Sequence, residues 1–307
     1  MKIVVAGGTG FLGAPLVDAL GGDHHDVVVL TRHSTHSSGA PQRRFVEWTP
    51  NGEAGPWAAA LDGAGAVINL SGESIAGGRW SAAHKQRVVD SRVKATRSLV
   101  AAIRAAATPP VVFVSGSAVG YYGPLGDEVV TEDRPAGADF LADVCVKWEA
   151  EAQRAASPRT RVAILRTGLV LERSGGALRR MLPPFWFGAG GPVGSGRQYW
   201  PWIHRRDWVE LVRWTIRTAE ISGPINATAP VPVTNREFAQ TLGRVIGRPA
   251  FVPAPAFALR LLLGEMADAL LLSGQRAVPA KAERHGFRFQ YARLEDALRA
   301  IFRSEAG

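Results

Sequence analysis

The stretch that decides the fold is Ile3-Val4-Val5-Ala6-Gly7-Gly8-Thr9-Gly10-Phe11-Leu12-Gly13, in which β-branched residues lead into a G-x-x-G-x-x-G turn. Residues 14–20 can continue from it as a helix. In a strand–turn–helix unit such glycines provide a tight turn, room for the backbone to touch a pyrophosphate, and close packing of helix on strand, with the helix N-terminus facing the phosphates. The stretch therefore predicts a dinucleotide site. Its expected cofactor-binding residues are Gly7, Thr9, Gly10, Phe11, Leu12 and Gly13.

The glycine spacing alone is weak evidence, because a chain with 34 glycines in 307 residues also produces it by chance. Two later triplets share the spacing, at positions 120, 123 and 126 and at positions 188, 191 and 194. Neither opens a helix-like run, and both stretches contain a proline, so we interpret them as loops. The first triplet is selected by its place between a strand and a helix.

Length and composition indicate a globular protein. A chain of 307 residues is longer than the usual length that folds around a single core. This length favours one large α/β domain or a main domain with a smaller partner. The net charge of +9 raises the question of nucleic acid, but the basic residues are dispersed or occur in pairs such as Arg43-Arg44. We therefore expect no nucleic-acid partner. Part of the positive charge is expected to serve an anionic cofactor and substrate.

Cysteine usage and hydropathy bear on the compartment. The single cysteine, Cys145, excludes an internal disulfide, suits a reducing compartment and is interpreted as a packing residue. Glycines break the apolar start, which argues against a signal segment, and the apolar stretch 257–272 contains three charged residues, so no membrane span is expected. We predict a cytoplasmic protein. The histidines and the cysteine lack metal-ligand spacing, so no metal is expected.

Short apolar runs alternate with helical patterns over the first 170 residues. The clearest expected strands lie at 26–30, 66–70, 111–114 and 162–165, and expected helices begin after Ser81 and near Asp139. This alternation predicts a Rossmann-type, doubly wound parallel sheet. We assign 1–170 to an NADP-binding domain and 171–307 to a smaller, mainly helical substrate-binding cap, from which some segments return to the first domain.

Within the expected cap, two features are singled out. The apolar and glycine-rich run 183–196 is predicted to be a loop, because it combines prolines and glycines with aromatic residues. His204 and Asp207 are expected to help organise the cap.

The residue after the second expected strand decides the cofactor. About 20 residues past the glycines, a carboxylate would bind the ribose 2′-hydroxyl of NAD, whereas a basic residue accommodates the 2′-phosphate of NADP. This position holds Arg32, which follows Thr31. The sequence therefore predicts NADP(H) as the cofactor.

Hydroxyl-bearing residues follow the strand at 111–114, in the run Ser115 to Gly123. Ligands bind outside the carboxyl ends of parallel strands. The substrate is therefore expected in this region, and it is expected to be a small molecule.

Several ordered motifs extend along nearly the whole chain. They are GGTGFLG at 7–13, INLSGE at 68–73, DSR at 90–92, GSAVGYYG at 116–123, VCVKWEAEA at 144–152, RTGLVL at 166–171, PWIH at 201–204, TNREFAQTLG at 234–243, LLSGQRAVP at 271–279 and GFRF at 286–289. Together they resemble the extended short-chain dehydrogenase/reductase superfamily. Within it they are similar to the NAD(P)-dependent epimerase/dehydratase family that includes short-chain dehydrogenase/reductase family 39U member 1, with its C-terminal domain of unknown function.

The resemblance implies further cofactor contacts. Thr31 and Arg32 would lie at the adenosine phosphate. Leu70 and Ser71 would run beside the cofactor, and Arg92 would reach toward it. The backbone of Leu169 would lie close to the nicotinamide.

The superfamily's catalytic groups are matched only in part. In these enzymes a serine positions the substrate, a tyrosine transfers a proton, and a lysine four residues later lowers the pKa of that tyrosine. Ser117 matches the serine. Lys147 lies in the right helix, but the residue four before it is Asp143, a carboxylate rather than a phenol.

A second alignment of the same helix leads to a different pair. If Glu149 takes the family's acidic helix position, Cys145 and Leu141 fall at the two dyad positions, and no acid–base pair remains. The missing phenol could be replaced by Tyr121 or Tyr122 from the loop after Ser117. Our catalytic candidates are Ser117, Tyr121 and Lys147.

Two functions of different classes follow. The first is an NADP(H)-dependent oxidoreductase or epimerase-like enzyme acting on a small molecule. The second, motivated by the absent tyrosine–lysine pair, is an NADP(H)-binding sensor or regulatory protein without turnover. A basic nucleic-acid binder on a Rossmann scaffold is the weakest reading.

Overall fold

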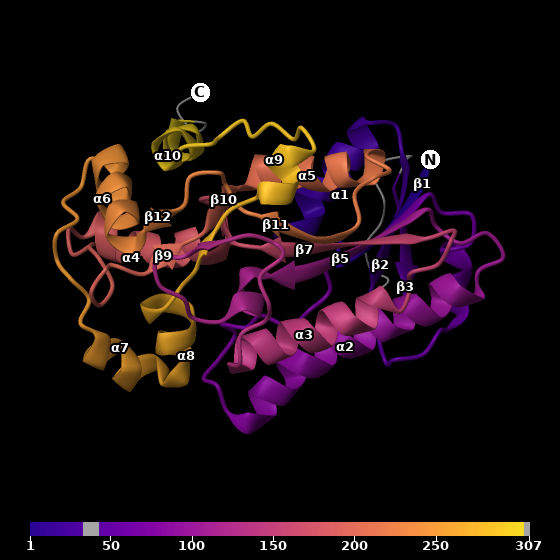
Figure 1. Cartoon of the computed structure of the whole chain (residues 1–307), viewed down its shortest axis with the longest axis horizontal. Helices are drawn as coiled ribbons and strands as arrows, with labels where there is room; N and C mark the ends of the chain where they lie inside the picture. The colour runs from indigo at the N-terminus through magenta and orange to yellow at the C-terminus, as the bar shows by residue number, and fades with distance from the viewer. Residues whose placement is uncertain (33–42, 304–307) are drawn as a thin grey trace.

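The computed structural model describes residues 1–32 and 43–303. Seven parallel strands form its main sheet in the order β11-β7-β5-β4-β1-β2-β3 (Figure 1). The strands are β1 (Lys2–Ala6), β2 (Asp26–Thr31), β3 (Arg43–Glu47), β4 (Ala66–Asn69), β5 (Val112–Ala118), β7 (Arg161–Thr167) and β11 (Gly223–Ala227). The strand order reverses between β1 and β4, and such a point leaves a crevice for a ligand at the carboxyl ends of the strands. The predicted Rossmann-type fold is confirmed.

Helices cover both faces of this sheet, which explains why its strands are continuous apolar runs rather than alternating ones. On one face lie α2 (Ala82–Ala105) and α3 (Phe140–Gln153), which run side by side in Figure 1. On the other face lie α1 (Gly13–Gly22) and α5 (Arg205–Arg217). Side chains alternate between the two cores, so that Val4 packs with the first pair of helices and Val5 with the second.

The second half of the chain adds a lobe beside the sheet, at the left of Figure 1. Its core holds α4 (Gly176–Trp186), α6 (Asn235–Ile246) and α10 (Leu294–Arg303). The remaining elements are short: β6 (Val129–Val130), β8 (Leu169–Leu171), β9 (Tyr199–Trp200), β10 (Trp202–His204), β12 (Val233–Thr234), β13 (Arg276–Ala277), α7 (Ala256–Leu263), α8 (Glu265–Ala267) and α9 (Ala280–Arg284), with single turns of tighter or wider helix at Pro56–Ala60, Val119–Tyr122 and Asp268–Leu272.

Two segments beyond residue 170 return to the first domain, one as a strand of the main sheet and one as a helix that covers it. Strand β11 pairs with β7 at the edge of the sheet, and α5 packs on the same face as α1. The prediction of a loop over 183–196 was wrong at its start, because residues 183–186 form the last turn of α4. Leu178, Leu182 and Phe185 recur at helical spacing and are buried, so packing holds the helix through two prolines.

His204 and Asp207, the pair expected to help organise the cap, both contact the chain at Gln290 and Tyr291. The Asp207 carboxylate accepts hydrogen bonds from the backbone N–H groups of Gln290 (2.8 Å) and Tyr291 (2.9 Å). The His204 ring lies 4.1 Å from the Tyr291 ring, and its Nδ1 accepts a hydrogen bond from the N–H of Arg206. Burial lowers the pKa of His204 to about 4, so it is a neutral acceptor at neutral pH. These contacts fasten the C-terminal segment to α5.

The glycine turn depends on the absence of side chains at two positions. Gly7 has a φ of +79°, which disfavours other residues, and its carbonyl accepts a hydrogen bond from the N–H of Gly10. A Cβ on Gly13 would lie 2.1 Å from the Gly7 carbonyl oxygen. Only glycine at position 13 therefore lets α1 begin directly against the turn.

We predict that Gly13→Ala lowers the free energy of unfolding by about 2–3 kcal/mol, because the new methyl group meets backbone that cannot move aside. The matched control is Gly21→Ala in the same helix, where an added Cβ meets no atom of the described chain within 4 Å. That variant should be neutral or up to about 1 kcal/mol more stable. Urea unfolding measures both, and equal effects would contradict the packing argument.

Candidate functional site

The turn after β1 and the segment after β4 lie side by side at the point where the strand order reverses. The N–H of Leu70 donates to the Ala6 carbonyl (2.9 Å), and a Cβ on Gly7 would lie only 2.8 Å from the Leu70 carbonyl carbon. The turn after β1 and the segment after β4 are therefore in contact. The Asn69 side chain fixes this segment by accepting the N–H of Ser71 (3.1 Å).

The start of α1 is open toward this crevice. Thr9 and Gly10 are exposed, and Leu12 stands at the N-cap without a capping side chain from the described part of the protein. The first N–H groups of a helix lack intrahelical partners and carry a partial positive charge, so they attract phosphate. These residues fit the diphosphate of a dinucleotide.

Other predicted cofactor residues lie around the same edge. Thr31 is buried at the end of β2, and the next residue, Arg32, is exposed. Phe11 faces the second half of the chain, where its ring packs against Gly175 and Gly176. A Cβ added to Gly175 would lie 2.6 Å from this ring, and a Cβ added to Gly176 would lie 2.9 Å from it. The structure thus brings Phe11 to the junction of the sheet with the neighbouring lobe.

Arg92 is buried behind the segment that follows β4. Its Nη1 donates to the carbonyls of Glu73 (3.0 Å) and Val88 (3.0 Å), and its guanidinium lies over the Trp148 ring. Burial lowers its pKa, although Arg92 remains a cation at neutral pH. Arg92 therefore supports the backbone beside the crevice. Leu169 begins β8, and its N–H donates to the Pro201 carbonyl (2.7 Å).

A polar row crosses the carboxyl ends of three neighbouring strands. Ser117 of β5 is paired in register with Arg166 of β7, which is paired with Asn226 of β11. All three residues are buried. Buried polar groups are costly unless they are hydrogen-bonded, so their partners define the site.

Glu149 of α3 connects this row to the helix. Ser117 Oγ donates to Glu149 Oε1 (2.6 Å), while Nε and Nη2 of Arg166 donate to the two carboxylate oxygens (2.9 Å each). The exposed fractions are 5% for Ser117, 9% for Glu149 and 3% for Arg166. Burial alone would lower the pKa of Arg166, but the hydrogen bonds and charge of Glu149 raise it above its usual value. Arg166 is therefore held as a guanidinium cation.

Tyr122 extends the row. Its hydroxyl donates to Asn226 Oδ1 (2.7 Å) and accepts from Arg166 Nη1 (3.1 Å). Burial raises the pKa of Tyr122 to about 12, so it stays a neutral phenol at neutral pH. The ring of the predicted residue Tyr121 packs on the same guanidinium, with 3.4 Å between the ring centroid and the Arg166 Cζ atom. We call Ser117, Glu149, Arg166, Tyr122 and Asn226 the polar cluster.

The structure does not bring Lys147 to Ser117. Its side chain is 54% exposed and forms an ion pair with Asp143 one turn earlier. Cys145, Trp148 and Glu149 of α3 contact the end of β5 instead: the Cys145 sulfur lies 3.7 Å from the Ala118 carbonyl oxygen, and the Trp148 ring packs beside Gly116. Burial raises the pKa of Cys145 to about 11, so it is a neutral thiol, as expected of a packing residue.

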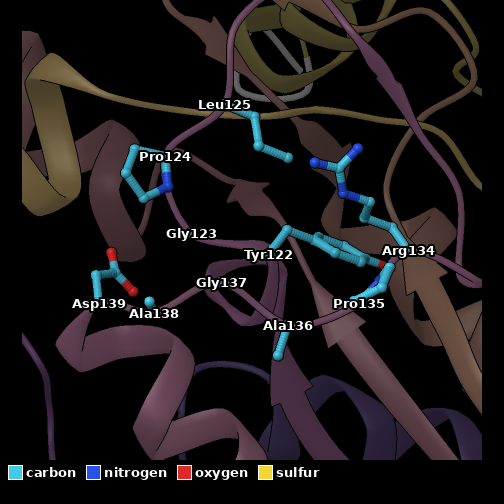
Figure 2. Close-up of a pocket in the computed structure, with 10 residues that line it drawn as sticks. All are labelled: Tyr122, Gly123, Pro124, Leu125, Arg134, Pro135, Ala136, Gly137, Ala138 and Asp139. Carbon is cyan, nitrogen blue, oxygen red and sulfur yellow. The ribbon is translucent and has the colours of Figure 1, made fainter.

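A cavity of about 690 Å³ adjoins the polar cluster (Figure 2). Two segments line it, 122–125 and 134–139. Tyr122 belongs to both the cavity and the cluster, and Asp139 at the cavity is the N-cap of α3, where it accepts the N–H of Ala142. The volume lies within the range of small-molecule sites.

Sequence reasoning missed Glu149 as a partner of Ser117, and it missed Arg166 and Asn226 altogether. A signal was present, because Glu149 follows Cys145 by four residues on a helix face that is otherwise apolar, and Arg166 interrupts an apolar strand. A charge at such a position requires a buried partner.

Over 1–32 and 43–303, no group of three or more His, Cys, Asp or Glu side chains could hold a metal ion. In the same part of the chain, no helix is both long and apolar enough to cross a bilayer.

Comparison with known proteins now places the chain. Residues 3–227 match the NAD dependent epimerase/dehydratase family, and residues 254–301 match a domain of unknown function (DUF1731). The chain belongs to the NAD dependent epimerase/dehydratase family. The resemblance drawn from the sequence motifs is therefore confirmed.

Individual members of the family are similar to nearly all of this chain. The chloroplastic epimerase family protein SDR39U1 homolog of Arabidopsis thaliana is 42% identical over 98% of this chain and 86% of its own. The crystal structure of human SDR39U1 with NADPH is 36% identical, with a TM-score of 0.88 over 98% of this chain and 99% of the human one. A nucleoside-diphosphate sugar epimerase from Corynebacterium glutamicum is 32% identical, with a TM-score of 0.77 over 97% of this chain and 57% of its own. The NADPH in the human structure supports the predicted cofactor.

We predict that Tyr122→Phe lowers the free energy of unfolding by about 1–3 kcal/mol, because it leaves an Asn226 oxygen and an Arg166 N–H without a buried partner. The control is Tyr121→Phe, which keeps the aromatic face on Arg166 and should change stability by less than about 0.5 kcal/mol. Urea unfolding compares the two variants. A neutral Tyr122→Phe would show that this hydroxyl contributes nothing to the cluster.

Proposed function

We propose that this protein is an NADP(H)-dependent oxidoreductase or epimerase-like enzyme of the extended short-chain dehydrogenase/reductase type, acting on a small molecule. The observation that carries the proposal is spatial. The Ser117 hydroxyl lies at the same carboxyl edge of the sheet as the open start of α1. A cofactor bound at that helix and extended along this edge would bring its reactive end toward Ser117.

The cofactor is proposed to bind along the crevice. Gly7, Gly10 and Gly13, with the N–H groups at the start of α1, would hold the diphosphate. Thr9, Phe11 and Leu12 belong to the same turn. Thr31 and Arg32 would hold the adenosine phosphate, because a guanidinium matches phosphate with paired hydrogen bonds.

The other end of the cofactor would meet the later segments of the crevice. Leu70, Ser71 and Leu169 would contact it through backbone, and Arg92 would act by supporting the segment after β4. When bound, NADP(H) supplies or accepts a hydride at the substrate carbon. Ser117 would bind the substrate oxygen, and Tyr121 would contribute its hydroxyl or its ring.

The substrate is proposed to carry a carbinol or carbonyl group. A sugar nucleotide is one candidate class, because the Corynebacterium glutamicum relative is described as a nucleoside-diphosphate sugar epimerase. The cavity beside Tyr122 has space for part of such a molecule. The single cysteine supports a reducing compartment such as the cytoplasm.

A second candidate function is an NADP(H)-binding sensor without turnover. The exposure of Lys147 favours it, because the superfamily's lysine has no counterpart beside Ser117 at that position. Its expected behaviour is tight NADPH binding with no hydride transfer.

Binding measurements test the cofactor assignment. We expect calorimetric titration to show tighter binding of NADPH than of NADH, and Arg32→Ala to weaken NADPH about tenfold, or about 1.4 kcal/mol, while leaving NADH unchanged. The control is Arg248→Ala, an exposed arginine of the other lobe, which should not alter either affinity. Equal affinities for the two cofactors, or unchanged selectivity in Arg32→Ala, would remove the basis for NADP(H).

Hydride transfer tests the enzymatic assignment. Deuterated NADPH is incubated with 9,10-phenanthrenequinone and with a panel of sugar nucleotides and their keto forms, and mass spectrometry follows the deuterium. Label in a product is the expected result. NADPH binding with no label in any product favours the sensor.

A further inference from the structure

We propose that Glu149 holds the proton exchanged at the substrate oxygen, with Ser117 Oγ as the relay between them, in place of the superfamily's tyrosine–lysine pair. The inference rests on the proposed function, and it names the acid–base group that the reaction needs. Its geometric basis is the hydrogen bond of 2.6 Å from Ser117 Oγ to Glu149 Oε1.

The direction of this hydrogen bond matters. Because Ser117 donates its own hydrogen to Glu149, its oxygen lone pairs remain able to accept a hydrogen from a substrate hydroxyl. The carboxylate is held by two hydrogen bonds to Arg166, so it cannot turn away from the serine. Glu149 is therefore a base in a fixed position, and the Ser117 hydroxyl lies between it and the proposed substrate.

The proton balance is complete in both directions. In oxidation, the substrate O–H proton passes to Ser117 Oγ while the original Ser117 proton passes to Glu149 Oε1, and the carbinol carbon gives up its hydride to NADP⁺ as the carbonyl forms. In reduction, Glu149 returns the proton through Ser117 to the oxygen of the nascent alcohol. Glu149 is neutral and Arg166 remains a cation after oxidation. Arg166 thus keeps its charge whether or not Glu149 holds the proton.

Other groups near Ser117 are less suited to hold this proton. Tyr122 donates its hydroxyl hydrogen to Asn226, and burial raises its pKa to about 12. Cys145 is a neutral thiol, since burial raises its pKa to about 11. Lys147 pairs with Asp143 in solvent. Glu149 accepts the hydrogen bond of Ser117 Oγ directly, so its carboxyl oxygen is the group placed to receive the serine proton.

A double-mutant cycle on hydride transfer tests the relay. Glu149→Gln and Ser117→Ala should each slow NADPH-dependent reduction of 9,10-phenanthrenequinone by about 100-fold, the usual scale of general acid–base catalysis. The double variant should be no slower than either single variant, because the two groups act as one unit.

The matched control is Glu151→Gln on the same helix. Glu151 is also buried and pairs with Arg97 and Arg154, yet it has no contact with the polar row. Its turnover should stay within about threefold of wild type. Because Glu149→Gln leaves Arg166 partly unpaired, thermal unfolding is measured for every variant, and Ser117→Ala provides a variant in which the ion pair is intact.

A readout that does not depend on turnover uses the apoprotein labelled with carboxyl-¹³C glutamate. The signal missing in Glu149→Gln belongs to Glu149, and it should shift in Ser117→Ala. It should not shift in Ser115→Ala, since the Ser115 hydroxyl bonds the Gly116 carbonyl instead.

The outcomes separate the two proposals. If the wild type binds NADPH but transfers hydride to no probe, the proposed function fails and the relay fails with it. If the wild type turns over and a folded Glu149→Gln keeps its rate within about threefold, only the relay is overturned. Additive losses in the double variant, or an unshifted Glu149 signal in Ser117→Ala, would equally overturn it.

Discussion

The site depends on one buried ion pair, between Glu149 of α3 and Arg166 of β7. Taking two charges out of water costs several kcal/mol per ion, and this cost is offset only when the geometry is good and the remaining donors and acceptors are used. Here the Glu149 carboxylate accepts hydrogen bonds from Arg166 and from the Ser117 hydroxyl. The remaining N–H groups on Nη1 of Arg166 donate to the Tyr122 hydroxyl and to the Glu132 carbonyl. An apolar pair could hold the helix as well. We therefore propose that the charges serve proton exchange at Ser117.

Parallel strand direction brings this pair to the cofactor crevice. The turn after β1, the segment after β4 and the end of β5 all lie at the carboxyl edge of one sheet. The glycine turn and Ser117 therefore share one edge of the sheet, where we propose that cofactor and substrate bind. The neighbouring lobe closes on the same edge where Phe11 packs against Gly175 and Gly176. In the proposed relay, Glu149 takes the part that a phenol takes in the superfamily.

Local patterns predicted much of the fold, the identity of the cofactor and the glycine turn that is proposed to bind it. The stretch 3–13 contains its own strand, turn and helix start, so its structure can be inferred from adjacent residues. The contact between Ser117 and Glu149 spans 32 residues, and that between Tyr122 and Asn226 spans 104. Such contacts depend on strand order and helix placement, which no local pattern contains. The helix over 183–186 was missed because buried packing overrides the two prolines.

The most direct measurement is a crystal structure of this protein with NADPH. We predict that the diphosphate lies on the glycine turn, that the 2′-phosphate contacts Arg32, and that the nicotinamide lies beside Ser117 with the Ser117–Glu149 hydrogen bond intact. A nicotinamide directed away from Ser117, or a Ser117 hydroxyl detached from Glu149, would contradict the account.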